Sequence, residues 1–190
     1  MSVNSSLYGK RLVVLTVTVG LVAMTLFSYV YRTGVMPLTT AQPTTQSNKV
    51  GLNADQSNKA LKFMEILKNN PENTEALAGL GDLFLQAKIW DKSASFWKRY
   101  LTLKPKDEEA IYHYAIALLN MDKINDSADQ FKRLVQVNPE NFHGYYYLGM
   151  LYVYYLDDKA RGKAYLEKVL AMNPDHPELL KSIRNELQKM

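Results

Sequence analysis

The sequence contains no cysteine among its 190 residues. This absence excludes disulfides, thiolate zinc sites, cysteine nucleophiles, covalent haem attachment and lipidation at a lipobox cysteine. It does not exclude an oxidising compartment, because a stable domain need not use disulfides. The composition, with 47% hydrophobic and 22% charged residues, is that of a globular chain able to bury a core. Its length predicts one modest domain with additional segments.

Acidic residues are absent from the beginning of the chain, since all 19 of them lie at or after Asp55. Four of the 23 basic residues, Lys10, Arg11, Arg32 and Lys49, precede that point, which leaves 19 basic residues to balance the 19 acidic ones. The formal charge of +4 therefore belongs to the N-terminal flank. No Lys/Arg stripe marks the balanced part, so a nucleic-acid partner is not expected.

A charge-free run of twenty residues occupies positions 12–31, LVVLTVTVGLVAMTLFSYVY. As a helix it would be about 30 Å long, which is the thickness of a bilayer's hydrocarbon core. It has no polar stripe of the kind that a buried soluble helix shows. Residues 12–31 are therefore expected to be a transmembrane anchor after a short N-terminal tail at 1–11. A cleaved signal peptide is the alternative, but the run exceeds the usual length of about 7–15 apolar residues.

The basic residues beside the run predict its orientation. Lys10, Arg11 and the terminal amine slightly outweigh Arg32 and Lys49, and the positive-inside rule then favours a cytoplasmic N-terminus. The expected location is a bacterial inner membrane, with the C-terminal domain in the periplasm. Residues 32–54 are rich in Thr, Gln, Asn, Pro and Gly without an apolar period, which predicts a flexible linker.

Proline recurs at a nearly fixed interval in the last two thirds of the chain. Pro71, Pro105 and Pro139 are 34 residues apart, and Pro174 follows after 35. A period of this size indicates a repeat architecture. Alignment on the prolines brings three copies of one pattern of large and small residues into register. They are Leu77-x-x-Leu80-Gly81-x-x-Phe84, Ile111-x-x-Tyr114-Ala115-x-x-Leu118 and Tyr145-x-x-Leu148-Gly149-x-x-Tyr152.

The pattern predicts a pair of helices in each copy. Large residues three and four apart form one helical face, and the small residue within that face permits contact with a second helix. A second small residue, followed four positions later by a large one, marks that second helix: Ser93 with Trp97, Ser127 with Phe131, and Gly162 with Leu166. Proline ends each second helix. Good N-caps for the next first helix lie two residues later, at Asn73, Asp107 and Asn141.

At these residues the chain resembles the tetratricopeptide repeat family, whose signature has this spacing. The resemblance implies an all-α fold, a tetratricopeptide helical-hairpin solenoid behind the N-terminal transmembrane helix. The chain departs from the family pattern in having Ser or Gly where alanine is usual late in the repeat, and in one extra residue in the third copy. Within a domain at 55–190, the expected repeats cover about 74–107, 108–141 and 142–176, and capping helices are expected at 57–69 and 177–190.

The first helix of the third copy lies in an unusually aromatic stretch, FHGYYYLGMLYVYYLDD at 142–158, which holds six of the chain's thirteen tyrosines. In the family's geometry first helices line a concave groove, and this helix would be apolar on both its packed and its groove faces. Such a helix is expected to be covered, either by Pro177–Met190 or by a partner segment, or by both in turn. The expected partner-binding groove residues are Leu85, Tyr112, Ile116, Leu119, Tyr146, Met150, Val153 and Tyr154.

One partner class is disfavoured by the groove. Family members that clamp a C-terminal carboxylate use Lys, Asn or Arg at groove positions, whereas the corresponding residues here are Ala78, Asp82, Glu109 and His113. The resemblance therefore implies a ligand that is an apolar or aromatic helix or extended segment, held by rings and by an adaptable methionine.

No catalytic motif stands out, and neither a cofactor nor a metal is expected, although His113 and His143 lie on neighbouring first helices. The sequence thus predicts a membrane-anchored, non-enzymatic scaffold for protein binding. Its architecture is similar to accessory subunits of cytochrome c haem-lyase assemblies, in which the groove captures the C-terminal helix of an apocytochrome. The alternatives are a structural or chaperone-like subunit of an envelope complex and, with the opposite orientation, an organelle import receptor.

Overall fold

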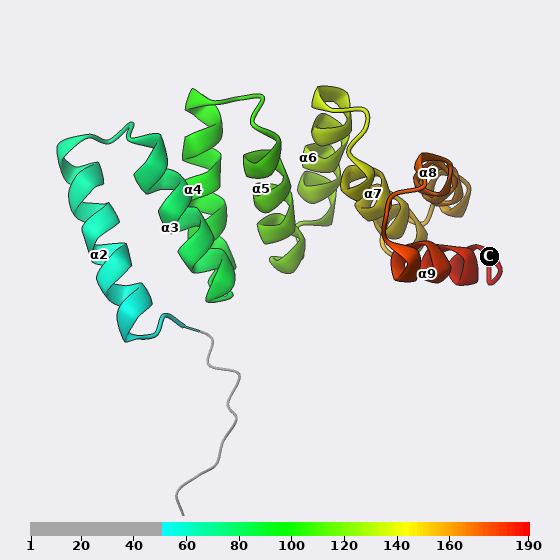
Figure 1. Ribbon diagram of the computed structural model, residues 1–190, viewed down its shortest axis with the longest axis horizontal. Helices are drawn as coiled ribbons and strands as arrows, with labels where there is room; N and C mark the ends of the chain where they lie inside the picture. The colour runs from blue at the N-terminus through cyan, green and yellow to red at the C-terminus, as the bar shows by residue number, and fades with distance from the viewer. Residues whose placement is uncertain (1–50) are drawn as a thin grey trace, which may run out of the picture. The chain divides into compact units, whose positions relative to one another are not determined.

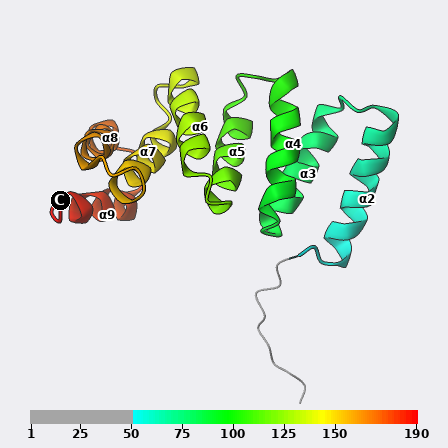
Figure 2. The ribbon, with the colours of Figure 1, turned by 180° about the vertical axis from the view of Figure 1, so that it is seen from behind.

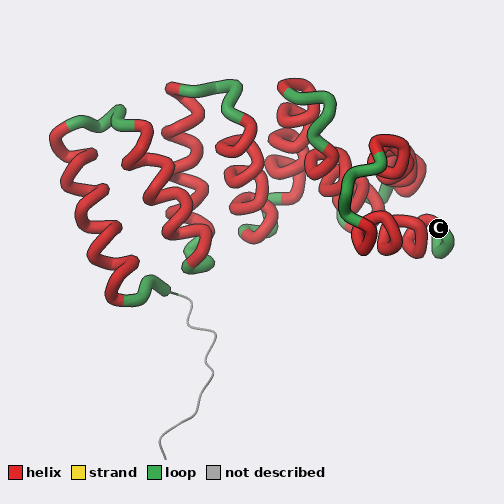
Figure 3. The backbone as a smooth tube through the Cα atoms, in the orientation of Figure 1, coloured by secondary structure: helices red, strands yellow, loops and turns green. Residues whose placement is uncertain are grey.

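The computed structural model describes residues 51–190. This part of the chain folds into eight consecutive helices without a strand, arranged as a row of antiparallel pairs (Figures 1, 2 and 3). The all-α hairpin solenoid predicted for this part is confirmed. The helices are α2 (Ala54–Asn69), α3 (Thr74–Gln86), α4 (Trp90–Leu103), α5 (Glu108–Asn120), α6 (Ile124–Val137), α7 (Phe142–Tyr154), α8 (Lys159–Met172) and α9 (Pro177–Leu187).

The predicted tail, the transmembrane anchor at 12–31 and nearly all of the linker lie outside the described residues. Within residues 51–190, no helix is both long enough and apolar enough to cross a bilayer. Helix α2 begins three residues before the start expected for the first capping helix. The reason is a capping box, in which the Asn53 side chain accepts from the Gln56 amide and the Gln56 side chain accepts from the Asn53 amide.

The N-caps predicted for the three first helices are confirmed. The side chains of Asn73, Asp107 and Asn141 each accept a hydrogen bond from the backbone amide three residues later. The extra residue of the third copy lies in the turn between α7 and α8. In the first two hairpins this turn places Lys88 and Asp122 in the left-handed region, and in the third, longer turn Asp157 takes that conformation.

The two helices of each hairpin meet at the predicted small residues. The buried hydroxyl of Ser93 donates to the carbonyl of Gly81 at 2.9 Å, and Ser127 repeats this bond to Ala115 at 2.9 Å. Glycine stands on both sides of the contact in the third hairpin. A Cβ built on Gly162 would lie 2.9 Å from the carbonyl oxygen of Gly149 and 2.6 Å from a Val153 methyl. The third pair of helices is thus too close for the serine used in the other two.

We expect Gly162→Ser to destabilise the protein by about 1–3 kcal/mol, because the added atoms would force the α7–α8 backbones apart. The measurement is the urea midpoint of unfolding followed by circular dichroism. Ala164→Ser on the exposed face of the same helix is the matched control, and it should shift the midpoint little. An unchanged midpoint for Gly162→Ser would show that the close approach is not required.

Candidate functional site

A pocket of about 620 Å³ lies between the C-terminal half of α5 and helix α7. It contains four of the eight predicted groove residues, Leu119, Tyr146, Met150 and Tyr154. The remaining lining residues are Asn120, Tyr147, Leu151 and Tyr155. All four lining tyrosines and Met150 are half-buried or exposed, so the pocket presents rings and a thioether to a ligand.

The other four predicted residues do not line this pocket. Tyr112 and Ile116 lie on α5 as half-buried residues packed against the central core. Leu85 lies half-buried on α3. Val153 is only 9% exposed, because it packs with Leu166 of α8 and Ile183 of α9. Its side chain is therefore part of the core at this end of the array and not part of an open surface.

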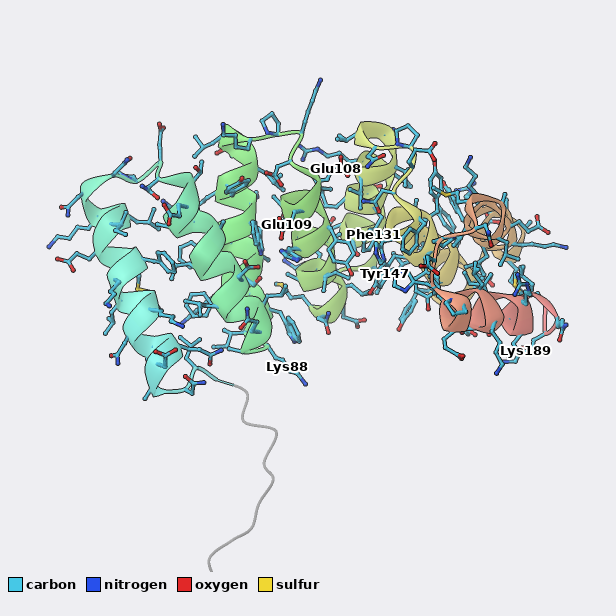
Figure 4. All side chains as sticks on the ribbon, in the orientation of Figure 1. Lys88, Glu108, Glu109, Phe131, Tyr147 and Lys189 are labelled. Atoms are coloured by element: carbon cyan, nitrogen blue, oxygen red, sulfur yellow. The ribbon has the colours of Figure 1, made fainter. Side chains whose placement is uncertain are left out.

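Tyr147 forms the inner wall of the pocket, a role that the sequence analysis did not assign to it. Its ring stacks on Phe131 of α6 with centroids 4.8 Å apart and an interplanar angle of 3° (Figure 4). The ring of Tyr112 meets it edge-on at 5.9 Å, and the two hydroxyl oxygens are 3.5 Å apart. Burial, reinforced by the Tyr112 hydroxyl, raises the pKa of Tyr147, so the wall stays neutral at physiological pH.

The other tyrosines of the aromatic segment divide between the packed face and the pocket. Tyr145 and Tyr152 contact Tyr165 of α8, at centroid distances of 6.3 and 5.6 Å. Tyr146, Tyr154 and Tyr155 line the pocket. The segment is apolar on nearly every side because its helix packs against α6 and α8 and also borders the pocket.

Helix α9 covers one flank of the pocket, as the sequence allowed for residues 177–190. Its buried Ile183, with Leu179 and Leu187, packs on a cluster that includes Tyr146 and Met150. At the rim the Tyr154 hydroxyl donates to the Glu186 carboxylate. Tyr154 and Tyr155 nevertheless remain 55% and 59% exposed. Residues 177–190 therefore cover part of the aromatic segment, while the rings of Tyr154 and Tyr155 remain an open surface.

The three histidines of the chain do not form a metal centre. Nδ1 of His113 lies 3.2 Å from the Asp82 carboxylate, within ion-pair range but not aligned as a hydrogen bond. The ring of Tyr112 lies between His113 and His143, at 5.6 and 5.8 Å from their centroids. Burial and the proximity of His176 lower the pKa of His143. Within residues 51–190 no three His, Asp or Glu side chains gather closely enough to hold a metal.

The hydrogen bond from Tyr154 lowers the pKa of Glu186 and raises that of Tyr154. Because the folded-state pKa of Glu186 is depressed, its contribution to stability is present above the ordinary glutamate pKa. It is lost as the pH falls from that value through the folded-state pKa. We expect Tyr154→Phe to raise the pKa of Glu186 toward its ordinary value, measured by NMR titration of the side-chain carboxyl carbon.

Tyr155→Phe, at the neighbouring exposed tyrosine, is the matched control and should leave this titration unchanged. A Glu186 titration that ignores Tyr154→Phe would contradict the bond between α7 and α9.

Comparison with known proteins agrees with this architecture. Tetratricopeptide repeat models match residues 59–108 and 144–176. The solved structure of MamA is 22% identical and has a TM-score of 0.62, covering 71% of this chain and 84% of that one. A MamA structure from Desulfovibrio magneticus RS-1 is 20% identical with a TM-score of 0.59, and the match covers 64% of this chain and 68% of that one. YrrB, described as a tetratricopeptide protein with an unusual peptide-binding site, is 20% identical with a TM-score of 0.61. The match covers 68% of this chain and 66% of that one. These identities show the fold alone.

A curated relative, the protein O-mannosyl-transferase Tmtc3 of Drosophila melanogaster, is 21% identical over 122 residues. The match covers 64% of this chain but only 13% of that protein. The transferase activity in its name belongs to that much longer protein as a whole. Tetratricopeptide arrays are generally non-catalytic scaffolds for protein interaction. The 34-residue period, the stacked helical hairpins and the two matching repeat models identify residues 59–108 and 144–176 as tetratricopeptide repeats.

Proposed function

We propose that the protein is a scaffold whose groove binds an apolar or aromatic segment of a partner protein. The observation that carries this proposal is the pocket of about 620 Å³ between α5 and α7. Its size falls in the usual range for ligand sites, about 300–1,000 Å³. Rigid rings are effective anchors for a partner because they provide large contact area at low entropic cost, and Met150 adapts to irregular shapes.

The rigidity of the pocket wall supports the same proposal. Tyr147 is held between Phe131 and Tyr112, so the wall is already formed before a ligand arrives. A preformed wall lowers the entropic cost of binding. The peptide-binding site in the description of YrrB, which shares the fold, is compatible with such a use of the array.

The proposal predicts that a photoreactive phenylalanine at position 146 crosslinks to a partner protein in cells, with the adduct identified by mass spectrometry. The same group at Gln136, which is exposed on α6, is the matched control and should not give that adduct. Crosslinks confined to residues 177–190 would instead mean that α9 alone occupies the groove, and the binding proposal would be wrong.

A more specific proposal names the location of the protein in the cell and the partner that it binds. Residues 12–31 would anchor the chain in a bacterial inner membrane, with the repeats in the periplasm. The groove would then hold the apolar C-terminal helix of an apocytochrome c before haem attachment. Support comes from the apolar, aromatic lining of the pocket and from the architectural resemblance to haem-lyase accessory subunits.

Under this more specific proposal, Met150→Ser should lower the level of c-type cytochromes several-fold, because it removes an apolar side chain that lines the pocket. The measurement is haem staining of membrane and periplasmic fractions from complemented deletion strains. Met64→Ser, at an exposed methionine of α2, is the control and should restore normal levels. Normal cytochromes in the deletion strain would exclude this partner and favour a structural or chaperone-like role in another envelope complex.

A further inference from the structure

The charges of the array are segregated between its two kinds of helix. The first helices of the three hairpins, α3, α5 and α7, contain no lysine or arginine at all. Their four acidic residues are Glu75, Asp82, Glu108 and Glu109. The second helices, α4, α6 and α8, also contain four acidic residues but nine basic ones. The basic residues are Lys92, Lys98, Arg99, Lys132, Arg133, Lys159, Arg161, Lys163 and Lys168.

Two of the acidic residues, Glu109 of α5 and Asp82 of α3, lie at the N-terminal half of α5, whose C-terminal half borders the pocket. Glu109 is exposed at the start of α5, and Tyr112, Ile116 and Leu119 follow it on the same helical face. Leu119 lines the pocket. At a rise of 1.5 Å per residue, Glu109 stands about 15 Å from Leu119 along the helix.

Asp82 extends this acidic end onto the neighbouring first helix. Its side chain is 41% exposed and points toward His113 of α5. Glu108, by contrast, is not free, because it accepts a hydrogen bond from the Asn138 side chain at 2.7 Å. Lys88 follows the C-terminal end of α3 and lies outside all three first helices (Figure 4). The groove face is therefore acidic near Asp82 and Glu109 and aromatic at the pocket.

We propose that the ligand of this groove is a cationic amphipathic segment of a protein, bound in one direction. This proposal rests on the proposed function and names the chemistry of the partner. The apolar or aromatic end of the segment occupies the pocket of Tyr146 and Met150, and its Lys or Arg residues face Asp82 and Glu109. The two ends of a helical ligand are separated by about ten residues, as the 15 Å distance requires.

The environment of the acidic end suits a cation for a second reason. His113 next to Asp82 has the rings of Trp97 and Tyr112 at 5.1 and 5.6 Å. A guanidinium group bound to the carboxylates would lie near the half-buried ring of Tyr112, whose face attracts cations, whereas Trp97 is only 3% exposed and lies in the core. An acidic segment would find no lysine or arginine on α3, α5 or α7 to pair with, and it would be repelled by both carboxylates.

The test uses the full-length chain in mild detergent and three fluorescent sixteen-residue peptides, with binding measured by anisotropy. The peptides share one apolar aromatic end and differ in having two Lys, two Gln or two Glu residues about ten positions away. We expect the Lys peptide to bind about tenfold more tightly than the Glu peptide in low salt. The difference should shrink in 1 M salt, where the Debye length falls to about 3 Å.

The isosteric double variant Asp82→Asn with Glu109→Gln should remove the preference for the Lys peptide while leaving the Gln peptide unaffected. Glu65→Gln with Glu72→Gln, at two exposed acidic residues near the N-terminal end of the array, is the control and should preserve it. Equal binding of all three peptides would overturn this inference and leave the proposed function standing. Failure of all three to bind, the Gln peptide included, would overturn both.

Discussion

The close contact between the two helices of each hairpin is the constraint on which the rest of the array depends. Two of the contacts are fixed by a buried serine hydroxyl on the opposing carbonyl, and the third by a glycine facing a glycine. Once this face of a first helix is committed to its hairpin partner, residues on its opposite side must face the neighbouring repeat or the groove. Each hairpin repeats this geometry, and the pocket between α5 and α7 is one consequence of it.

The end of the array explains why a pocket remains open there. Every hairpin but the last is covered by the next one, and a terminal element must therefore close the stack. Helix α9 does so incompletely, because it buries Ile183 against Val153 and α8 but leaves Tyr154 and Tyr155 more than half exposed. A full hairpin in its place would present another first helix to the groove. The short cap thus protects the core while it leaves aromatic surface accessible.

Local periodicity was enough to predict the helices, their caps and their small contact residues, because each depends on neighbours within a few positions. Tyr147 was missed because its partners, Tyr112 and Phe131, lie 35 and 16 residues earlier in the chain. The predicted groove residues came from the family's geometry, in which the same positions of every first helix face the groove. In this chain α9 crosses there, and Val153 becomes core. Only contacts between elements could have shown this.

The separation of acidic first helices from basic second helices has a structural cause only on the side of the second helices. Arg99 and Arg133 each donate to the carbonyl of the proline 28 residues earlier, Pro71 and Pro105, which ties each second helix to the preceding loop. Arg161 instead lies 4.8 Å from the Tyr152 ring and donates to its hydroxyl. These basic residues therefore have structural roles outside the groove.

The groove acids have no comparable role within residues 51–190. Asp82 meets only a histidine within ion-pair range, and Glu109 forms no ion pair there. The exposed carboxylate of Glu109 has only its favourable position in the first turn of α5 to contribute to the stability of the array. Folding contacts account for Arg99, Arg133 and Arg161 on the second helices, whereas the absence of cations from the first helices is what the proposed cationic ligand would explain.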